Sequence, residues 1–156
     1  MQLIDILARD RVVADLRVSS KKRLLEQLAD LLSADHDAGV QRSIFEALIA
    51  REHLGSTGLG QGVAIPHGRV ASDIQPTAAF VRLKDGIDFD APDGEAVDLL
   101  LALVVPEHFT DQHLALLAQV AELFSHPEVC EELRSATDSQ QLFERLSERT
   151  LQFSTV

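Results

Sequence analysis

The sequence is poor in cysteine and has no long hydrophobic run. Cys130 is the one cysteine among 156 residues, so no internal disulfide framework can form, and a reducing, cytoplasmic location is expected. No apolar stretch reaches the roughly eighteen residues that a membrane-spanning helix needs. The first residues, MQLIDILARDRVV, lack a basic region, an apolar core and a cleavage site, so no signal peptide is expected.

Basic residues are outnumbered by acidic ones. The chain has 14 lysines and arginines against 25 aspartates and glutamates, which gives a formal net charge of −11 at pH 7. Such a surface repels the phosphate backbone of nucleic acids, so no nucleic-acid partner is expected. The charge suits a protein partner with a basic surface, and it is equally consistent with charge that serves only solubility.

No internal repeat, low-complexity tract or linker divides the chain. A length of 156 residues, or 17.1 kDa, is enough for one hydrophobic core and short for two complete domains. We therefore expect a single domain over residues 1–150, followed by a C-terminal tail over residues 151–156.

Two amphipathic helices are predicted in the first third of the chain. Leucines recur at helical spacing in residues 19–32, with Ser19 or Ser20 as the candidate N-cap. This helix is expected to end near Gly39. The apolar spacing of residues 40–52 predicts a second helix.

Strands are predicted in the middle of the chain. Residues 63–65 are expected to form a short strand that Pro66 ends, because proline has no N–H to donate. The sequence TAAFVRL, residues 77–83, predicts a second strand, followed by a turn at Asp85–Gly86. Residues 96–106 are a nearly continuous apolar run, which suits a strand buried on both faces.

Two or three helices are predicted to close the chain. One begins after Thr110 and extends to Phe124, and Pro127 is a favourable first residue for the next. Thr137 and Gln140 match a capping box at the start of the last helix. Helices on both sides of central strands indicate a layered α/β domain.

One glycine-rich segment surrounds a single histidine. Residues 55–70, GSTGLGQGVAIPHGRV, place five glycines and one proline around His67. A neutral imidazole is nucleophilic near neutral pH, since its unperturbed pKa is about 6.5. It can accept a phosphoryl group on one ring nitrogen while the other donates to a backbone carbonyl. The alternative is a turn whose histidine merely caps backbone groups.

Groups that bind anions stand near His67 in the sequence. The glycine N–H groups could approach an anion closely, and Ser56 and Thr57 add hydroxyl donors. Arg51, Arg69 or both could supply cationic hydrogen bonds to a phosphoryl group. These residue types fit phosphoryl chemistry at His67, and the segment by itself fits a simple turn equally well.

A second histidine strengthens this interpretation. His113 falls in the first turn of the helix that begins after Thr110, where the helix dipole favours negative charge. We expect a phosphoryl group on His67 to be held between His113 and the free N–H groups of that turn. Taken by itself, His113 would be interpreted as a surface helix residue.

The stretch REHLGSTGLGQGVAIPHG, residues 51–68, resembles the phosphorylation-site signature of the fructose/mannitol-type IIA domains of the bacterial phosphotransferase system. The resemblance extends from about Leu3 to Leu146. The segments SSKKRLLEQLADLL, GIDFDAPDGEAVDLLLALVVPE and HLALLAQVAELF are most similar to the nitrogen-regulatory branch, the PtsN-like IIA proteins. The resemblance implies the mannitol-type IIA fold, in which a mixed β-sheet is flanked by α-helices on both sides.

The resemblance also implies a site and partners. His67 matches the phosphoryl-accepting histidine and His113 the second active-site histidine, which stabilises the phosphoryl group. Arg51, Ser56 and Thr57 match the arginine and the loop hydroxyls, and no cofactor or metal is implied. The implied donor is an HPr-type phosphocarrier, charged from phosphoenolpyruvate through an enzyme I.

In the nitrogen-regulatory branch, such a component is a relay protein rather than a stand-alone enzyme. Members of that branch regulate protein targets, including potassium-transport and sensor-kinase systems, and insertion into the membrane is not expected. One alternative is a sugar-specific IIA component that passes phosphate to a IIB domain for fructose or mannitol uptake. Another is a binding module in which the glycine loop only holds an anion or a peptide.

A metal hydrolase is a further alternative. Glu107, His108 and His113 lie close together in the sequence, but a spacing of five residues points the two histidines about 140° apart on a helix. No H-E-x-x-H motif or cysteine pair is present, which makes this class improbable. The remaining histidines, His36, His53 and His126, are given no functional role.

Overall fold

Strand β6 (Val97–Pro106) lies at the centre of a six-stranded mixed sheet and is buried along nearly its whole length. The computed structural model describes residues 1–71 and 73–153. Strand β5 pairs with β6 in antiparallel orientation, and β1 pairs with β5 in parallel. On the other side β3 and β4 both pair with β6 in parallel, and β2 pairs with β3 in antiparallel orientation. The other strands are β1 (Val12–Leu16), β2 (Gly58–Gly60), β3 (Val63–Ala64), β4 (His67–Val70) and β5 (Thr77–Ile87).

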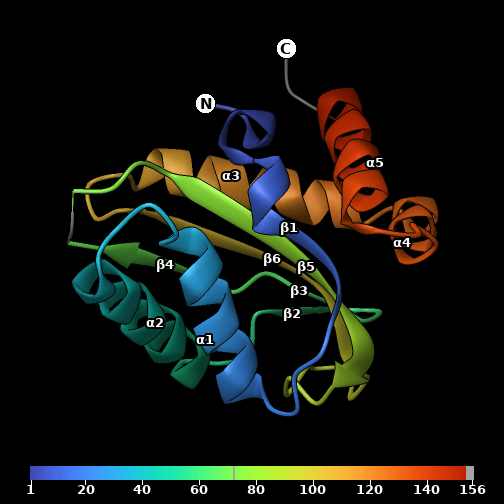
Figure 1. The fold of residues 1–156 in the computed structure, drawn as a ribbon, viewed down its shortest axis with the longest axis horizontal. Helices are drawn as coiled ribbons and strands as arrows, with labels where there is room; N and C mark the ends of the chain where they lie inside the picture. The colour runs from blue at the N-terminus through green and yellow to red at the C-terminus, as the bar shows by residue number, and fades with distance from the viewer. Residues whose placement is uncertain (72, 154–156) are drawn as a thin grey trace.

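Helices cover both faces of this sheet (Figure 1). Leu99, Leu101 and Leu103 of β6 belong to one apolar cluster with α3, α4 and α5, and the alternating residues Leu100 and Ala102 belong to another with α1 and α2. Because side chains alternate across a strand, a buried run such as β6 needs cover on both sides. The helices are α1 (Lys21–Leu32), α2 (Ala38–His53), α3 (Asp111–Phe124), α4 (Pro127–Arg134) and α5 (Ser139–Gln152), with the 3-10 helices η1 (Leu3–Ile6) and η2 (Arg9–Arg11).

The predicted α/β class and the mixed sheet flanked on both sides are therefore confirmed. The predicted tail, residues 151–156, begins inside the last turns of α5, and residues 154–156 lie outside the described part of the chain.

The first two helices follow the predicted pattern with one correction. Ser20 caps α1, because its side chain accepts a hydrogen bond from the N–H of Arg23. The helix ends at Leu32 and does not extend to Gly39. The reason is Asp37, which caps a new helix, so that Gly39 becomes the second residue of α2.

Strand β5 is longer than predicted. It continues to Ile87, so the turn predicted at Asp85–Gly86 is wrong and these residues lie inside the strand. The register between β5 and β6 shifts between Arg82 and Ile87. A shift of this kind accommodates a glycine and exposed polar residues within a strand.

The last helix is capped one residue later than predicted. Pro127 is the first residue of α4, as expected. At α5 the carboxylate of Asp138 accepts from the N–H of Gln141, while the side chain of Gln141 accepts from the N–H of Thr137. The capping residues are thus Asp138 and Gln141 in place of Thr137 and Gln140.

Candidate functional site

His67 is the first residue of a strand that a proline interrupts. Strands β3 and β4 pair with β6 in the same register, since Val63 pairs with Leu99 and His67 pairs with Leu103, 36 positions later in each case. Pro66 has no N–H to donate, but its carbonyl accepts from the N–H of Leu103 and keeps the register. The predicted short strand does end before Pro66, as β3, but a second strand that was not predicted, β4, begins at His67 and holds it.

Alternation along β4 separates the functional side chains from the packing contacts. Gly68 faces α2, where an added Cβ would lie 3.0 Å from the Cβ of Ala47. Its neighbours His67 and Arg69 point to the opposite side, as successive residues in a strand do. His113, at the start of α3, lies on that side, and its ring centroid is 5.4 Å from that of His67 at an interplanar angle of 74°.

One nitrogen of the His67 ring is hydrogen-bonded to a backbone carbonyl. Nδ1 lies 2.7 Å from the carbonyl oxygen of Ile65, and because a carbonyl can only accept, Nδ1 carries the proton. Burial lowers the pKa of His67, and the neighbouring Arg51 lowers it further, against the raising effects of the Ile65 hydrogen bond and Glu52. The ring is therefore neutral near pH 7, with an unprotonated Nε2.

His113 is held neutral beside it. Its side chain is buried, with the residue 7% exposed. Burial, followed by the charges of His67 and Arg69, lowers its pKa to about 4. Nε2 of His113 is buried and has no hydrogen-bond partner among the described residues. A buried polar nitrogen without a partner is costly, so a ligand that supplies one would be favoured here.

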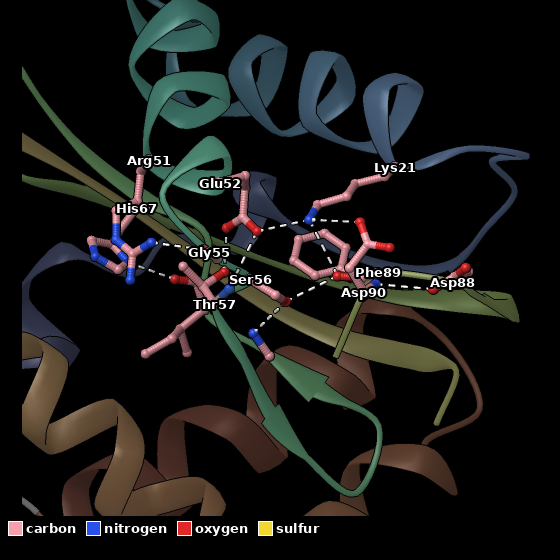
Figure 2. Close-up of polar contacts among 12 residues, drawn as sticks. Lys21, Arg51, Glu52, Gly55, Ser56, Thr57, His67, Asp88, Phe89 and Asp90 are labelled. Carbon is pink, nitrogen blue, oxygen red and sulfur yellow. Dashed lines mark hydrogen bonds and ion pairs between the residues drawn. The ribbon is translucent and has the colours of Figure 1, made fainter. Parts of the chain in front are cut away.

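The two histidines open on a cavity of about 750 Å³ between the end of α2, β4 and the start of α3. Arg51 and Arg69 contribute cationic groups to its wall. Arg51 is at present held by the carbonyl of Gly55, to which its Nη1 donates at 2.8 Å (Figure 2). The lining residues are Ala47, Ala50, Arg51, Leu54, His67, Gly68, Arg69, Glu107, Thr110, His113, Leu114 and Leu117.

Two large apolar side chains flank this cavity. Leu54 is 84% exposed and Leu114 is 67% exposed. Exposed apolar groups beside a cavity are typical of surfaces that another protein covers.

The loop hydroxyls do not reach the cavity in this structure. The hydroxyl of Ser56 donates to the carbonyl of Phe89 at 2.9 Å, and that of Thr57 donates to the carboxylate of Glu52. Neither residue lines the cavity. Their predicted contact with a phosphoryl group stays a prediction, and their visible role is to fix the loop.

The glycines of the segment also differ from the expected anion cradle. The N–H of Gly55 donates to the carbonyl of Glu52, and that of Gly58 donates to the hydroxyl of Ser56. Gly68 is the one glycine that lines the cavity. The glycines serve instead in close packing and tight turns, as at Gly62, which has φ +83.

Two residues that the sequence analysis missed stand beside the site. Glu52 follows Arg51 in the last turn of α2 and is buried against the loop, paired with Lys21. The signal for Glu52 in the sequence was its position next to Arg51. This signal is weak, because charged residues at the end of a helix are usually exposed to solvent. Thr110 lines the cavity, and its hydroxyl does not cap α3 although it occupies the N-cap position.

No group of three or more histidine, cysteine or acidic side chains among residues 1–71 and 73–153 could hold a metal ion. His108 contacts the ring of Phe109, with centroids 4.8 Å apart. His126 stacks on Phe153 and lies within 3.5 Å of two glutamates. Within the described part, no helix is long and apolar enough to cross a membrane.

The mixed sheet covered by helices on both faces and the adjacent pair of histidines are what is expected of a IIA-type component of a phosphotransferase system. Comparison with known proteins shows the family. The family model described as "Phosphoenolpyruvate-dependent sugar phosphotransferase system, EIIA 2" matches residues 5–149, so the chain belongs to this family.

Within the family, the chain is similar to nitrogen regulatory proteins. That of Pseudomonas aeruginosa is 43% identical over 92% of this chain and 94% of the relative, and that of Escherichia coli is 38% identical over 95% and 91%. The crystal structure of the nitrogen regulatory protein IIA-Ntr from Neisseria meningitidis has a TM-score of 0.85 at 44% identity, covering 92% of this chain and 98% of that one. The predicted resemblance to the nitrogen-regulatory branch is confirmed.

Proposed function

We propose that this protein accepts a phosphoryl group on Nε2 of His67 from an HPr-type phosphocarrier and regulates other proteins according to its phosphorylation state. The observation that carries the proposal is the hydrogen bond from Nδ1 of His67 to the carbonyl of Ile65. It leaves Nε2 as the nucleophilic nitrogen of a neutral ring that faces a cavity.

The chemistry needs few parts. Nε2 of His67 forms a bond to phosphorus as the bond from phosphorus to the carrier's histidine nitrogen breaks, and the leaving nitrogen keeps the electron pair. Phosphoryl transfer depends mainly on positioning and on charge stabilisation. The His67 ring gains positive charge in this step, and the carbonyl of Ile65 stabilises it through the proton on Nδ1.

The surroundings suit a phosphoryl group on His67. Nε2 of His113 lacks a partner among the described residues and can hydrogen-bond a phosphoryl oxygen once it carries a proton. Arg51 can exchange the Gly55 carbonyl for that group, since charge-assisted hydrogen bonds to phosphate are stronger than those to a carbonyl. Ser56 and Thr57 support the loop beneath.

Protein surfaces around the cavity support a carrier as donor. Leu54 and Leu114 offer apolar contact area beside the ring, and the net charge of −11 favours a carrier with a basic surface. The names of the similar proteins support nitrogen-related regulation, and a cytoplasmic location is part of this proposal. Potassium-transport and sensor-kinase systems are the target classes that we propose.

Intact-mass spectrometry tests this function. The chain is incubated with phosphoenolpyruvate, enzyme I and an HPr-type carrier from the same cell, beside His67→Ala and the exposed-site control His53→Ala. One acid-labile phosphoryl adduct on the parent and on His53→Ala, and none on His67→Ala, is the expected result. If no adduct forms with a carrier shown to be active, the relay is refuted and the loop is a binding site only. Transfer onward to a purified IIB domain would instead assign a sugar-specific role.

A further inference from the structure

Glu52 is a buried carboxylate next to the cavity that the transfer chemistry does not use. Its side chain is 5% exposed. One oxygen accepts from the backbone N–H of Thr57 at 3.2 Å, and the other accepts from the Thr57 hydroxyl. Glu52 thereby ties the loop that follows α2 back onto the end of that helix.

Lys21 joins this contact to a third part of the chain. Its Nζ lies 3.0 Å from Oε1 of Glu52 and donates to the carbonyl of Phe89 at 3.2 Å. The same ammonium sits 4.3 Å from the centroid of the Phe89 ring, and Ser56 donates to the same carbonyl. Figure 2 shows these side chains converging from α1, from the end of α2 and from the segment before β6.

This network bears on the cavity through Arg51. The carbonyl that holds the Arg51 guanidinium belongs to Gly55, which lies between Glu52 and Thr57 in the chain. The N–H of Gly55 is bonded to the carbonyl of Glu52, and the contacts of Thr57 with the Glu52 carboxylate hold the other end of this short turn. Release of Thr57 therefore loosens the Gly55 carbonyl that holds Arg51 beside His67. Misplacement of about 1 Å of a group that positions the reacting atoms can cost about a hundredfold in rate.

The negative charge of Glu52 also favours phosphoryl acceptance by His67. Among the groups around the ring, the Glu52 carboxylate raises the pKa of His67, whereas burial and Arg51 lower it. A negative charge at this position favours the positive ring that forms when Nε2 takes the phosphoryl group. The ammonium of Lys21 forms an ion pair with this carboxylate, with Nζ 3.0 Å from Oε1.

We propose that Glu52 is a positioning residue for phosphoryl acceptance, which it serves by fixing Thr57 and, through the loop, Arg51 beside His67. This inference rests on the proposed function of His67. A purely structural ion pair would affect only folding, whereas a positioning role for Glu52 means that its side chain also affects the rate of the transfer step.

The experiment compares four variants with the parent. Glu52→Gln removes the charge and replaces one acceptor oxygen with a donor, and Thr57→Val removes the hydroxyl at nearly constant shape. Thr57→Ser restores the hydroxyl, and Glu46→Gln makes the same change at an exposed position of α2. Single-turnover transfer from phosphorylated HPr-type carrier is measured over a range of carrier concentrations. The His67 titration is followed by NMR, and thermal melting shows that each variant is folded.

Glu52→Gln and Thr57→Val should lower the saturating transfer rate by on the order of tenfold or more, with the half-saturating carrier concentration changed by less than about twofold because the docking surface stays intact. Glu52→Gln should also move the His67 titration to lower pH. Thr57→Ser, which keeps a hydroxyl, should recover most of the rate that Thr57→Val loses, and Glu46→Gln should behave as the parent.

Parent-like saturating rates in folded Glu52→Gln and Thr57→Val would overturn the positioning role while leaving the proposed function intact. A loss confined to the half-saturating concentration would overturn it as well, since it would place Glu52 in carrier binding. Failure of the parent itself to accept phosphate from an active carrier would overturn the proposed function and this inference together.

Discussion

Replacing Gly68 with alanine should push helix α2 away from strand β4. A Cβ at position 68 would lie 3.0 Å from the Cβ of Ala47 and 3.3 Å from its carbonyl carbon. Unstrained carbon–carbon contacts lie at about 3.5–4.0 Å. Because the obstacle is helix backbone and not the end of a flexible side chain, α2 must move by roughly 0.5 Å, the difference between these two separations.

The expected cost follows from this crowding. Overpacking of a well-packed interface costs about 1–3 kcal/mol, which for a chain of this size lowers the melting temperature by about 2–4 °C per kcal/mol. Arg51 lies one turn beyond Ala47 on the same side of α2, so the shift also moves its guanidinium relative to His67. We expect slower phosphoryl acceptance together with the loss of stability.

A matched substitution separates crowding from other effects of Gly68→Ala. Ala47→Gly removes the obstructing Cβ and by itself costs about 0.5–1 kcal/mol, as glycine does in a helix interior. Urea unfolding of both single variants and the double variant gives the coupling free energy, expected at about 1 kcal/mol in favour of the double variant. Additive losses, or an unchanged unfolding free energy in Gly68→Ala, would refute the reasoning.

Three further predictions follow from buried polar groups. Arg82→Met should lower the free energy of unfolding in urea by about 3 kcal/mol, because the buried guanidinium donates to three carbonyls at and just after the end of α4. Lys84 is exposed on the same strand, so Lys84→Met should leave the stability near that of the parent. Equal losses in the two variants would contradict this prediction. Folding lowers the pKa of His113 from 6.5 to about 4, so between these pH values the unfolded chain binds a proton that the folded chain does not. The free energy of unfolding should therefore drop by about 3 kcal/mol as the pH falls from 6.5 to 4. A His113→Gln variant whose stability depends on pH in the same way would contradict this prediction. His113→Ala should still accept phosphate, only more slowly, in the mass assay, and complete loss with intact carrier binding would show a larger role.

The parts of the fold that depend on local pattern were predictable from the sequence. The apolar run of β6 and the helical spacing of leucines in α1 each reflect burial that the residues themselves dictate. Strand β4 was not predictable, because HGRV contains a glycine and follows a proline, and its pairing with β6 joins residues 36 positions apart. The strand through Asp85–Gly86 likewise depends on a shift in register against β6.

Part of the candidate site was likewise predictable from the sequence, and part was not. His67 and His113 were predictable as a pair, since one follows from the glycine-rich segment and the other from its place at the start of a helix. The contacts of Ser56 and Thr57 were not. They depend on the carbonyl of Phe89, 33 positions from Ser56, and on a carboxylate at the end of α2 that looks solvent-exposed in the sequence.

The most direct test of the account is to identify the nitrogen of His67 that carries the phosphoryl group, by 15N and 31P NMR of the phosphorylated protein. The hydrogen bond from Nδ1 to the carbonyl of Ile65 predicts phosphorylation at Nε2, with the Nδ1 proton retained. A phosphoryl group on Nδ1 of His67, or on another residue, would contradict the geometry from which the function was inferred.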